Sequence, residues 1–206
     1  MIDANNVRRE LYRDVRLQIV TVNEFNNHAA TVFHTSYAYD PVRQITGVTD
    51  DQGNVTVVAY DLFGRRTAIN SPDAGLTTFT YDLADNLTAK QTANLAATGQ
   101  QVTFAYQFNR VTAISYPNFP QNNVTYTYGA ASQRNPSASG NVVGRITHIT
   151  DRAGTEDRLY GPLGEIVKET RAIPIQGGQV AHYNTKFTFD TWNRTAQIAY
   201  PIEFRS

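Results

Sequence analysis

The 206-residue sequence contains no cysteine, one methionine and one tryptophan. The lack of cysteine excludes a disulfide framework and thiolate chemistry, and it removes the sulfur ligands of common zinc sites. Lysine and arginine together number 18, as do aspartate and glutamate, so the formal net charge is zero. A chain balanced in this way gives no electrostatic reason to expect a nucleic acid or an anionic membrane as its partner.

Long apolar runs are also missing from the sequence. No window holds the ~18 consecutive apolar residues that a membrane-spanning helix requires. Residues 1–6 have neither the basic region nor the apolar run of a signal peptide. We therefore expect neither a membrane span nor a signal peptide in this chain.

What the sequence does contain is a repeated phrase. Its clearest copy runs from Val55 to Arg66, with the centre Tyr60-Asp61-Leu62-Phe63-Gly64-Arg65. Related phrases start at Tyr39, Tyr60, Tyr81, Tyr106, Tyr128, Tyr160 and Phe189, which are spaced by 21, 21, 25, 22, 32 and 29 residues. A period of this length indicates a repeat architecture.

Each phrase predicts one β-hairpin. The residues two before the aromatic are bulky and those one before are small or β-branched, as Val58 and Ala59 are before Tyr60. Successive strand residues point to opposite faces, so one face of the predicted sheet is aromatic and the other is small or β-branched. Val, Thr, Tyr and Phe are also the residues that favour strands. Neighbouring hairpins are expected to pair, which gives an all-β fold built on a long, curved antiparallel sheet.

The turns of these hairpins carry their own signals. An aspartate after the aromatic can bond the backbone amide two residues on. Residues that tolerate positive φ stand near the turn's end. The aspartates are Asp40, Asp61, Asp82 and Asp190, and the positive-φ candidates are Gly64, Gly164, Asp85, Asn109 and Asn193. Because the aspartates recur in several units, we interpret them as turn residues rather than as catalytic carboxylates, which act as one matched pair.

This pattern, Tyr-Asp-x-x-Gly-Arg followed by Asp-x-x-Gly-Asn, resembles the YD repeat of the RHS family. Asp51-Gln52-Gly53-Asn54-Val55 is interpreted as the clearest copy of the second half. The family includes bacterial RHS toxins, the B and C components of Tc toxin complexes, and the barrel of teneurins. The resemblance covers nearly the whole chain and departs from the pattern at Gln107, Gly129, Gly161 and Phe189.

The resemblance implies a structural function. Repeats of this family spiral into a hollow shell that encloses a toxin domain. The implied partners are flanking RHS/YD-repeat regions and an enclosed C-terminal effector, and the implied location is secreted or cell-surface, reached by a toxin-delivery system. The residues expected to build the wall are Tyr39, Asp40, Tyr60, Asp61, Gly64, Arg65, Tyr81, Asp82, Tyr106, Arg110, Tyr128, Tyr160, Gly164 and Asp190. Arg65 and Arg110 are candidates for hydrogen bonds between strands. The alternative is an extracellular carbohydrate-binding or protein-binding adhesion module, in which the repeated aromatics are exposed.

We expect one repeat region over residues 1–206, as a segment of a larger protein. Residues 1–36 are interpreted as a degenerate repeat in which Tyr12-Arg13-Asp14-Val15-Arg16 resembles Tyr39 to Arg43. Residues 37–92 hold the clearest repeats. Residues 93–206 hold repeats with longer insertions, among them loops at 93–101 and 129–141 and a hairpin turned by Gly177-Gly178.

No catalytic residue, metal site or cofactor is predicted. The four histidines are scattered, and His148 is expected to be a hydrogen-bonded or surface residue. Asp50-Asp51 could hold calcium but has no EF-hand spacing. The family's aspartyl autoprotease signature, Asp-Pro-x-Gly, is not matched, because Asp40-Pro41 is followed by Val42-Arg43.

Overall fold

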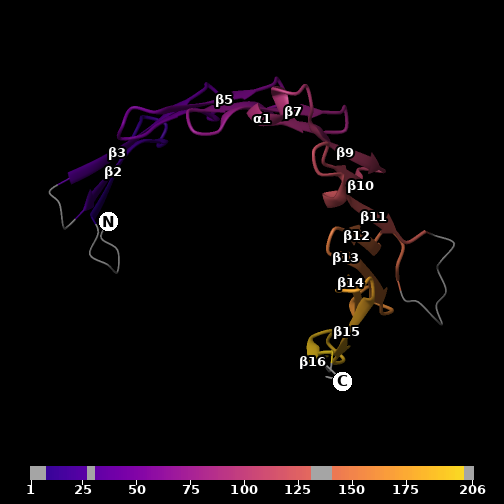
Figure 1. Ribbon diagram of the computed structural model, residues 1–206. Helices are drawn as coiled ribbons and strands as arrows, with labels where there is room; N and C mark the ends of the chain where they lie inside the picture. Colours follow the sequence, from indigo (N-terminus) through magenta and orange to yellow (C-terminus); the bar gives the residue numbers. More distant parts are fainter. Residues whose placement is uncertain (1–7, 27–30, 131–140, 202–206) are drawn as a thin grey trace. The chain divides into compact units, whose positions relative to one another are not determined.

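The computed structural model describes residues 8–26, 31–130 and 141–201. The chain divides into two compact units, residues 1–101 and residues 102–206. In each unit the strands follow one another in chain order, and each pairs antiparallel with the next (Figure 1). The all-β antiparallel fold predicted from the sequence is therefore confirmed. The expected single repeat region over residues 1–206 stays a prediction.

The first unit contains eight strands and one short helix among its described residues. They are β1 Arg8–Arg13, β2 Ile19–Asn26, β3 Thr31–Tyr39, β4 Ile45–Thr49, β5 Val55–Tyr60, β6 Arg66–Ser71, β7 Gly75–Tyr81, β8 Leu87–Gln91 and α1 Ala93–Ala96. The YD turns connect β1 to β2, β3 to β4, β5 to β6 and β7 to β8, so each repeat is one hairpin, as expected.

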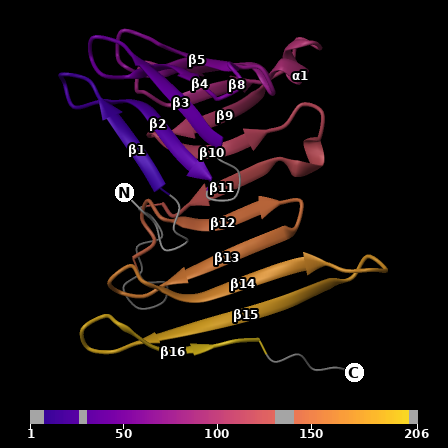
Figure 2. The ribbon, with the colours of Figure 1, turned by 90° about the vertical axis from the view of Figure 1, so that its left-hand side faces the viewer.

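The second unit also contains eight described strands. They are β9 Val102–Gln107, β10 Arg110–Ser115, β11 Val124–Tyr128, β12 Ile146–Asp151, β13 Gly154–Tyr160, β14 Ile166–Pro174, β15 Val180–Phe189 and β16 Thr195–Ala199, with a 3-10 helix, η1 Pro120–Asn122. Figure 2 shows β12 to β16 side by side as a meander. Gly177 and Gly178, both at positive φ, turn the β14–β15 hairpin as predicted.

The two faces of the sheet differ as the sequence pattern predicts. In β5, Thr56, Val58 and Tyr60 are half-buried, while Val55, Val57 and Ala59 are exposed. The same alternation runs along β9 and β15. The aromatic side chains therefore cover one face together.

The repeated aromatics are less buried than a core position would be. Among the described residues, the buried apolar side chains are Ala89, Val142 and Tyr160, and Tyr160 is 6% exposed. Tyr39, Tyr60, Tyr81, Tyr106 and Tyr128 are half-buried. Of the repeated tyrosines, Tyr160 is therefore the one that is buried.

Two local predictions need correction. The segment 93–101, expected to be a loop, begins with the one-turn helix α1. Alanine has the highest helix propensity, and two of the four residues from Ala93 to Ala96 are alanine, with Ala97 following. The loop predicted at 129–141 falls mostly outside the described residues.

The degenerate first repeat is shifted by one residue from the expected alignment. Asp14, not Arg13, makes the turn bonds that Asp40 makes, since the amide of Asp14 donates to the carbonyl of Gln18 and that of Asp40 to the carbonyl of Gln44. Arg13 therefore stands in the place of Tyr39, next to the turn aspartate.

Candidate functional site

The repeated turn is best seen between β5 and β6. The Asp61 amide donates to the carbonyl of Arg65 over 2.9 Å, and the Gly64 amide donates to the carbonyl of Asp61 over 3.0 Å. Asp61 Oδ1 accepts from the amides of Phe63 and Arg65. Gly64 has φ of +79°, which is the left-handed position of a turn closed by a bulge. The bulge appears as the register shift between Ala59 and Tyr60.

The same backbone pattern recurs through both units. The residues that take the place of Asp61 are Asp14, Asp40, Asp50, Asp82, Gly161 and Asp190. Every aspartate in this set accepts two backbone amides through Oδ1, those two and four residues on. In the Asp-x-x-Gly-Asn turn the bonding residue is Asp50, so the interpretation that started this copy at Asp51 is corrected by one residue. Gly161 keeps the backbone bonds without a side chain.

These hydrogen bonds favour the ionised carboxylates. Burial opposes ionisation of Asp61, but the Arg65 amide and guanidinium outweigh it, so the pKa of Asp61 lies below its ordinary value of 3.8. The Asn86 side chain and amide lower the pKa of Asp82, and Asn54 acts in the same way on the pKa of Asp50. The Arg194 amide and side chain lower the pKa of Asp190. All four are therefore acceptors at neutral pH, which suits a turn and does not suit an acid catalyst.

The tyrosines join one hairpin to the next. Each donates its hydroxyl to a backbone carbonyl at the start of the second strand of the preceding hairpin. The pairs are Tyr39 to Ile19 (2.7 Å), Tyr60 to Ile45 (3.0 Å), Tyr81 to Arg66 (2.9 Å), Tyr128 to Val111 (2.8 Å) and Tyr160 to Ile146 (2.5 Å). We call this contact the tyrosine joint.

Every tyrosine joint lies where strand pairing between hairpins has stopped. The β4–β5 pairing, for example, ends at Gly47 and Val57, two residues beyond Ile45 and three before Tyr60. The Tyr60 hydroxyl thus connects the two strands beyond their last paired residues. A buried or half-buried carbonyl without a partner is costly, and the hydroxyl supplies that partner.

Arginines after the turn lie over the tyrosine of the next hairpin. The guanidinium carbon of Arg65 is 4.9 Å from the ring centre of Tyr81, that of Arg110 is 5.0 Å from Tyr128, and that of Arg145 is 5.8 Å from Tyr160. These are cation–π distances. Each arginine therefore covers the same ring whose hydroxyl makes a tyrosine joint.

Neighbouring turns of the first unit are also connected directly. Arg16 donates to the carbonyl of Pro41, Gln44 to the carbonyl of Gly64, and Arg65 to the carbonyl of Asp82. Arg65 also pairs with Asp61 at 2.7 Å and with Asp85 at 2.8 Å. Gln44 and Arg65 stand four positions after their turn aspartates, whereas Arg16 stands two after Asp14, and each of the three reaches the following turn.

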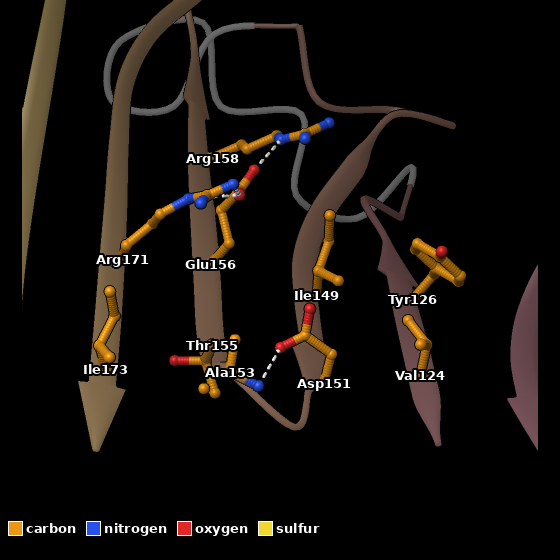
Figure 3. Close-up of a pocket in the computed structure, with 11 residues that line it drawn as sticks. Val124, Tyr126, Ile149, Asp151, Ala153, Thr155, Glu156, Arg158, Arg171 and Ile173 are labelled. Atoms are coloured by element: carbon orange, nitrogen blue, oxygen red, sulfur yellow. Dashed lines mark hydrogen bonds and ion pairs between the residues drawn. The ribbon is translucent and has the colours of Figure 1, made fainter. Parts of the chain in front are cut away.

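The second unit carries a hollow of about 310 Å³ on the aromatic face of β11 to β14 (Figure 3). Its residues include Val124, Tyr126, Ile149, Asp151, Glu156, Arg158, Arg171 and Ile173. Glu156 is 8% exposed. Its Oε1 accepts from Arg158 at 2.7 Å, and its Oε2 accepts from Arg171 at 2.8 Å.

The glutamate of this hollow is held ionised. Burial opposes its ionisation, but the hydrogen bonds from Arg158 and Arg171 outweigh burial and lower the pKa of Glu156. Both carboxylate oxygens are occupied by guanidinium donors. Glu156 is therefore placed to tie β13 to β14 rather than to take a proton from a substrate.

His148 lies on the other face and is hydrogen-bonded, as predicted. Its Nδ1 is 2.7 Å from Asp157 Oδ1, and its Nε2 is 3.0 Å from Thr150 Oγ1. This is the order of a hydroxyl–imidazole–carboxylate triad, but the Asp157 side chain is 61% exposed and the group lies outside the hollow. His148 and Asp157 are also direct cross-strand partners, so we interpret the group as a polar row across the sheet.

Other candidate ligands do not gather into a site. Within the described ranges, no three His, Asp or Glu side chains are placed to hold a metal ion. None of the helices that the structure describes is long and apolar enough to cross a membrane. His28 lies outside the described residues.

Comparison with protein families gives a match at the clearest repeats. The RHS repeat model matches residues 39–76 and again residues 60–96. Residues 39–96 thus carry RHS repeats. The two matches overlap and are offset by the 21 residues that separate Tyr39 from Tyr60. Comparison with curated protein sequences finds no match.

Similarity of fold to solved structures extends beyond the matched residues. A crystal structure of TcdB2-TccC3 is 18% identical with a TM-score of 0.70, over 92% of this chain and 11% of that chain. A crystal structure of TcdB2-TccC3-TEV is 17% identical with a TM-score of 0.69, over 93% of this chain and 10% of that chain. The crystal structure of TcdB2-TccC3 without its hypervariable C-terminal region is 14% identical with a TM-score of 0.63, over 94% of this chain and 11% of that chain. The chain thus spans about a tenth of the length of these structures, and at such identities the similarity concerns the fold.

The repeat residues expected from the sequence occupy the turns and tyrosine joints described above. Tyr39, Tyr60, Tyr81, Tyr128 and Tyr160 make tyrosine joints, and Asp40, Asp61, Asp82 and Asp190 make turns with Gly64 or its counterparts. Gly164 has φ of +86°, and Tyr106 pairs with Val111 in the β9–β10 hairpin. Their role in a wall stays a prediction.

The structure also adds residues that the sequence did not indicate. Gln44 and Arg145 act where Arg65 does, and for Gln44 the spacing of four residues after the turn aspartate could have shown this. The Glu156 cluster could not have been found in that way, because Glu156 and Arg171 meet only through the register of β13 and β14.

Proposed function

We propose that this chain is a segment of the wall of an RHS/YD-repeat shell, with a steric and non-enzymatic function. The wall encloses an effector polypeptide and keeps it from its targets until delivery. Its partners are flanking RHS/YD-repeat regions and the enclosed C-terminal effector, and delivery takes the assembly to the cell surface or outside the cell.

The tyrosine joint is the observation that supports this proposal most. It lets identical hairpins add in series with one register, so a sheet of any length follows from one local rule. The wall needs no pocket and no reactive group. The turn carboxylates are ionised acceptors within the backbone, and Glu156 is neutralised by two arginines.

The similarity to TcdB2-TccC3 supports the same function. The match covers 94% of this chain even in the structure without the hypervariable C-terminal region. The matched fold therefore belongs to the part of that protein that remains when the hypervariable region is absent. A wall segment is expected in such a part, and a cargo segment is not.

A binding or adhesion module is the second candidate. Its original support, a row of exposed tyrosines, is weakened because the hydroxyl of Tyr81 is donated to Arg66 and its ring lies against Arg65. Apolar side chains at the turn tips support it better, since Phe63, Phe108 and Trp192 are 76–81% exposed. Trp192 is the sole tryptophan of the chain, so its fluorescence reports on ligands that contact this tip.

The test uses the full-length protein that its gene encodes. Limited proteolysis with mass spectrometry is expected to show an unfolded segment that resists protease. Electron cryomicroscopy is expected to show a continuous sheet around that segment. Tyr81→Ala should expose that segment to cleavage, while Leu83→Ala at a fully exposed turn tip should not. A particle whose entire polypeptide lies in the sheet, with nothing enclosed, would overturn the wall function. A saturable change in Trp192 fluorescence with a glycan would favour the binding module.

A further inference from the structure

In the part of the chain that the structure describes, the outer edge of β16 has no paired strand. All five residues of β16, Thr195–Ala199, are exposed. Within the residues that the structure describes, β16 pairs on one side only, with β15. Open edges are templates for further strand pairing, so the geometry of this edge decides which strands it accepts.

The existing joints define where an incoming tyrosine hydroxyl must arrive. In each joint the accepting carbonyl belongs to the residue that stands opposite the turn-flanking residue of its own hairpin. Ile45 stands opposite Tyr39, Arg66 opposite Tyr60, Val111 opposite Tyr106, Ile146 opposite Tyr128 and Ile19 opposite Arg13. In the last hairpin, Thr195 stands opposite Phe189. The carbonyl of Thr195 therefore occupies the acceptor position.

The existing joints also fix the strand register. The residue two after the acceptor pairs with the residue three before the next aromatic. The pairs are Thr21–Ser36, Gly47–Val57, Ala68–Thr78, Ala113–Thr125, His148–Asp157 and Lys168–Lys186. On β16 this residue is Gln197. An incoming strand would thus place the residue three before its tyrosine opposite Gln197 and its tyrosine hydroxyl on Thr195.

Arg194 completes the receiving edge. It stands four residues after Asp190, as Arg65 stands four after Asp61, and it pairs with Asp190 at 2.7 Å. Arg65 lies over the next tyrosine as well as over Phe63 in its own turn. Arg194 lies 4.9 Å from the ring centre of Trp192, the residue equivalent to Phe63. In the described residues Arg194 thus has the ring of its own turn, as Arg65 has Phe63. An incoming tyrosine would supply the second ring, as Tyr81 does for Arg65.

We propose that the edge of β16 is a docking site for the tyrosine-ended strand of another RHS/YD-repeat hairpin, read by three features. They are the Thr195 carbonyl, the register at Gln197 and the guanidinium of Arg194. The site continues an interface that the molecule already repeats. The docking proposal does not depend on what the wall encloses, so a negative result in the proteolysis test of the enclosed effector would not contradict it.

A second copy of this chain is a poorer occupant. The only strand of its first unit with an open edge in the described residues is β1, which has Arg13 in the place of the tyrosine. Arg13 has no hydroxyl to place on Thr195. The edge of β16 therefore discriminates in favour of hairpins that carry Tyr before the turn aspartate.

The test titrates the 206-residue chain with a synthetic hairpin of residues 55–71. Added terminal cysteines close the peptide, which avoids relying on an isolated hairpin that is marginally stable in water. The matched control is the same peptide with Tyr60→Phe, and circular dichroism verifies that both are folded. Binding is followed by the fluorescence of Trp192, and the docking position by hydrogen exchange of backbone amides.

Docking on β16 predicts slower exchange at Thr195–Ala199 and unchanged exchange at Arg8–Arg13. The Tyr60→Phe peptide should bind about two- to tenfold more weakly, the value of one hydrogen bond. Arg194→Gln in the chain should weaken both peptides by about two- to fivefold, since the ring remains. Equal affinities of the two peptides, protection at β1 instead of β16, or no binding of the folded peptide would each overturn the proposal.

Discussion

Most turns of the two units differ in chemistry and agree in geometry. In the first unit, Asp14, Asp40, Asp61 and Asp82 occupy the YD turns. In the second unit the same place holds Gly129, Gly161 and Asp190. The β9–β10 hairpin differs, because it turns through Phe108 and Asn109, which both have positive φ. Tyr128 and Tyr160, which precede two of the glycines, still make tyrosine joints of 2.8 and 2.5 Å. The aspartate therefore stabilises the turn where it is present, but the turn also forms without it. Both units share the tyrosine joint and its register.

The insertion after Tyr128 makes the same point. The amide of Gly129 donates to the carbonyl of Arg145 over 2.9 Å, and the amide of Gly144 donates to the carbonyl of Gly129 over 2.9 Å. These are the two backbone bonds of the Asp61 turn, although many more residues separate the bonded positions. A long insertion thus leaves the hairpin and the joint of Tyr128 in place, because the chain returns to the same closing bonds.

The largest effect is expected from removing a joint together with its ring. Tyr160 is the most buried of the joint tyrosines, lies beneath Arg145 and donates to Ile146. Tyr160→Ala should lower the free energy of unfolding by about 3–5 kcal/mol, by analogy with buried Phe→Ala. Thermal and urea unfolding measure this. A loss below 1 kcal/mol would show that the ring does not hold the hairpins together.

A smaller effect is expected from forcing the first unit's turn chemistry on the second. A side chain on Gly161 would collide with the carboxylate of Glu165. Gly161→Asp should therefore destabilise by about 1–3 kcal/mol, as overpacking does, with like-charge repulsion added. The pair Gly161→Asp with Glu165→Arg rebuilds the Asp61–Arg65 arrangement and should recover most of the loss. If the double variant is no more stable than the single one, turns of the two units are not interchangeable.

Acid is expected to open aspartate turns of the first unit before a glycine turn of the second unit. Asp50, Asp61 and Asp82 of the first unit have a lowered pKa, whereas in the second unit this holds for Asp190 and Glu156. A lowered folded pKa stabilises above the unfolded pKa of about 4, and the stabilisation is lost as pH falls through the folded value. Hydrogen exchange at falling pH, corrected for intrinsic rates, should show the aspartate turns of residues 50–54, 61–65 and 82–86 opening before the turn of 161–165. Simultaneous opening of all turns would contradict this.

The smallest expected effect is a gain in stability. Phe189 stands where the other hairpins have tyrosine, three residues after Lys186, which pairs with Lys168 in the common register. Ile166, opposite Tyr160, holds the acceptor position. Phe189→Tyr should therefore add a joint and stabilise by about 0.5–1.5 kcal/mol. Thr185→Val on the same strand and face is the control, because it adds no hydroxyl. A Phe189→Tyr variant that is less stable than the parent would show that the rule does not extend to this hairpin.

Much of this fold could be predicted from local sequence. Period-two alternation before each aromatic predicts the strands, and glycine or asparagine after the aspartate predicts the positive φ seen at Gly64 and Asn193. Arg43, with φ of +72°, gave no such signal, since a long side chain is unusual there. The shift of the first repeat to Asp14 also escaped, because Tyr12 is a better match by residue type than Arg13.

Contacts between strands were harder to predict. The Glu156–Arg171 pair and the His148–Asp157 pair depend on register, which insertions obscure. The tyrosine joint links residues 14–20 apart and needs the turn bulge to bring ring and carbonyl together. Local pattern fixes which residues form strands, while the bulges decide which of their polar groups meet.

Hydrogen exchange of the Tyr60→Phe variant tests the tyrosine joint most directly, because the ring stays and only the hydroxyl bonded to Ile45 is removed. The account predicts faster exchange at the β4–β5 joint, around Gly47 and Val57, with little change inside the β5–β6 hairpin. Unchanged exchange at the joint, or equal acceleration throughout both hairpins, would contradict the claim that this hydroxyl connects one repeat to the next.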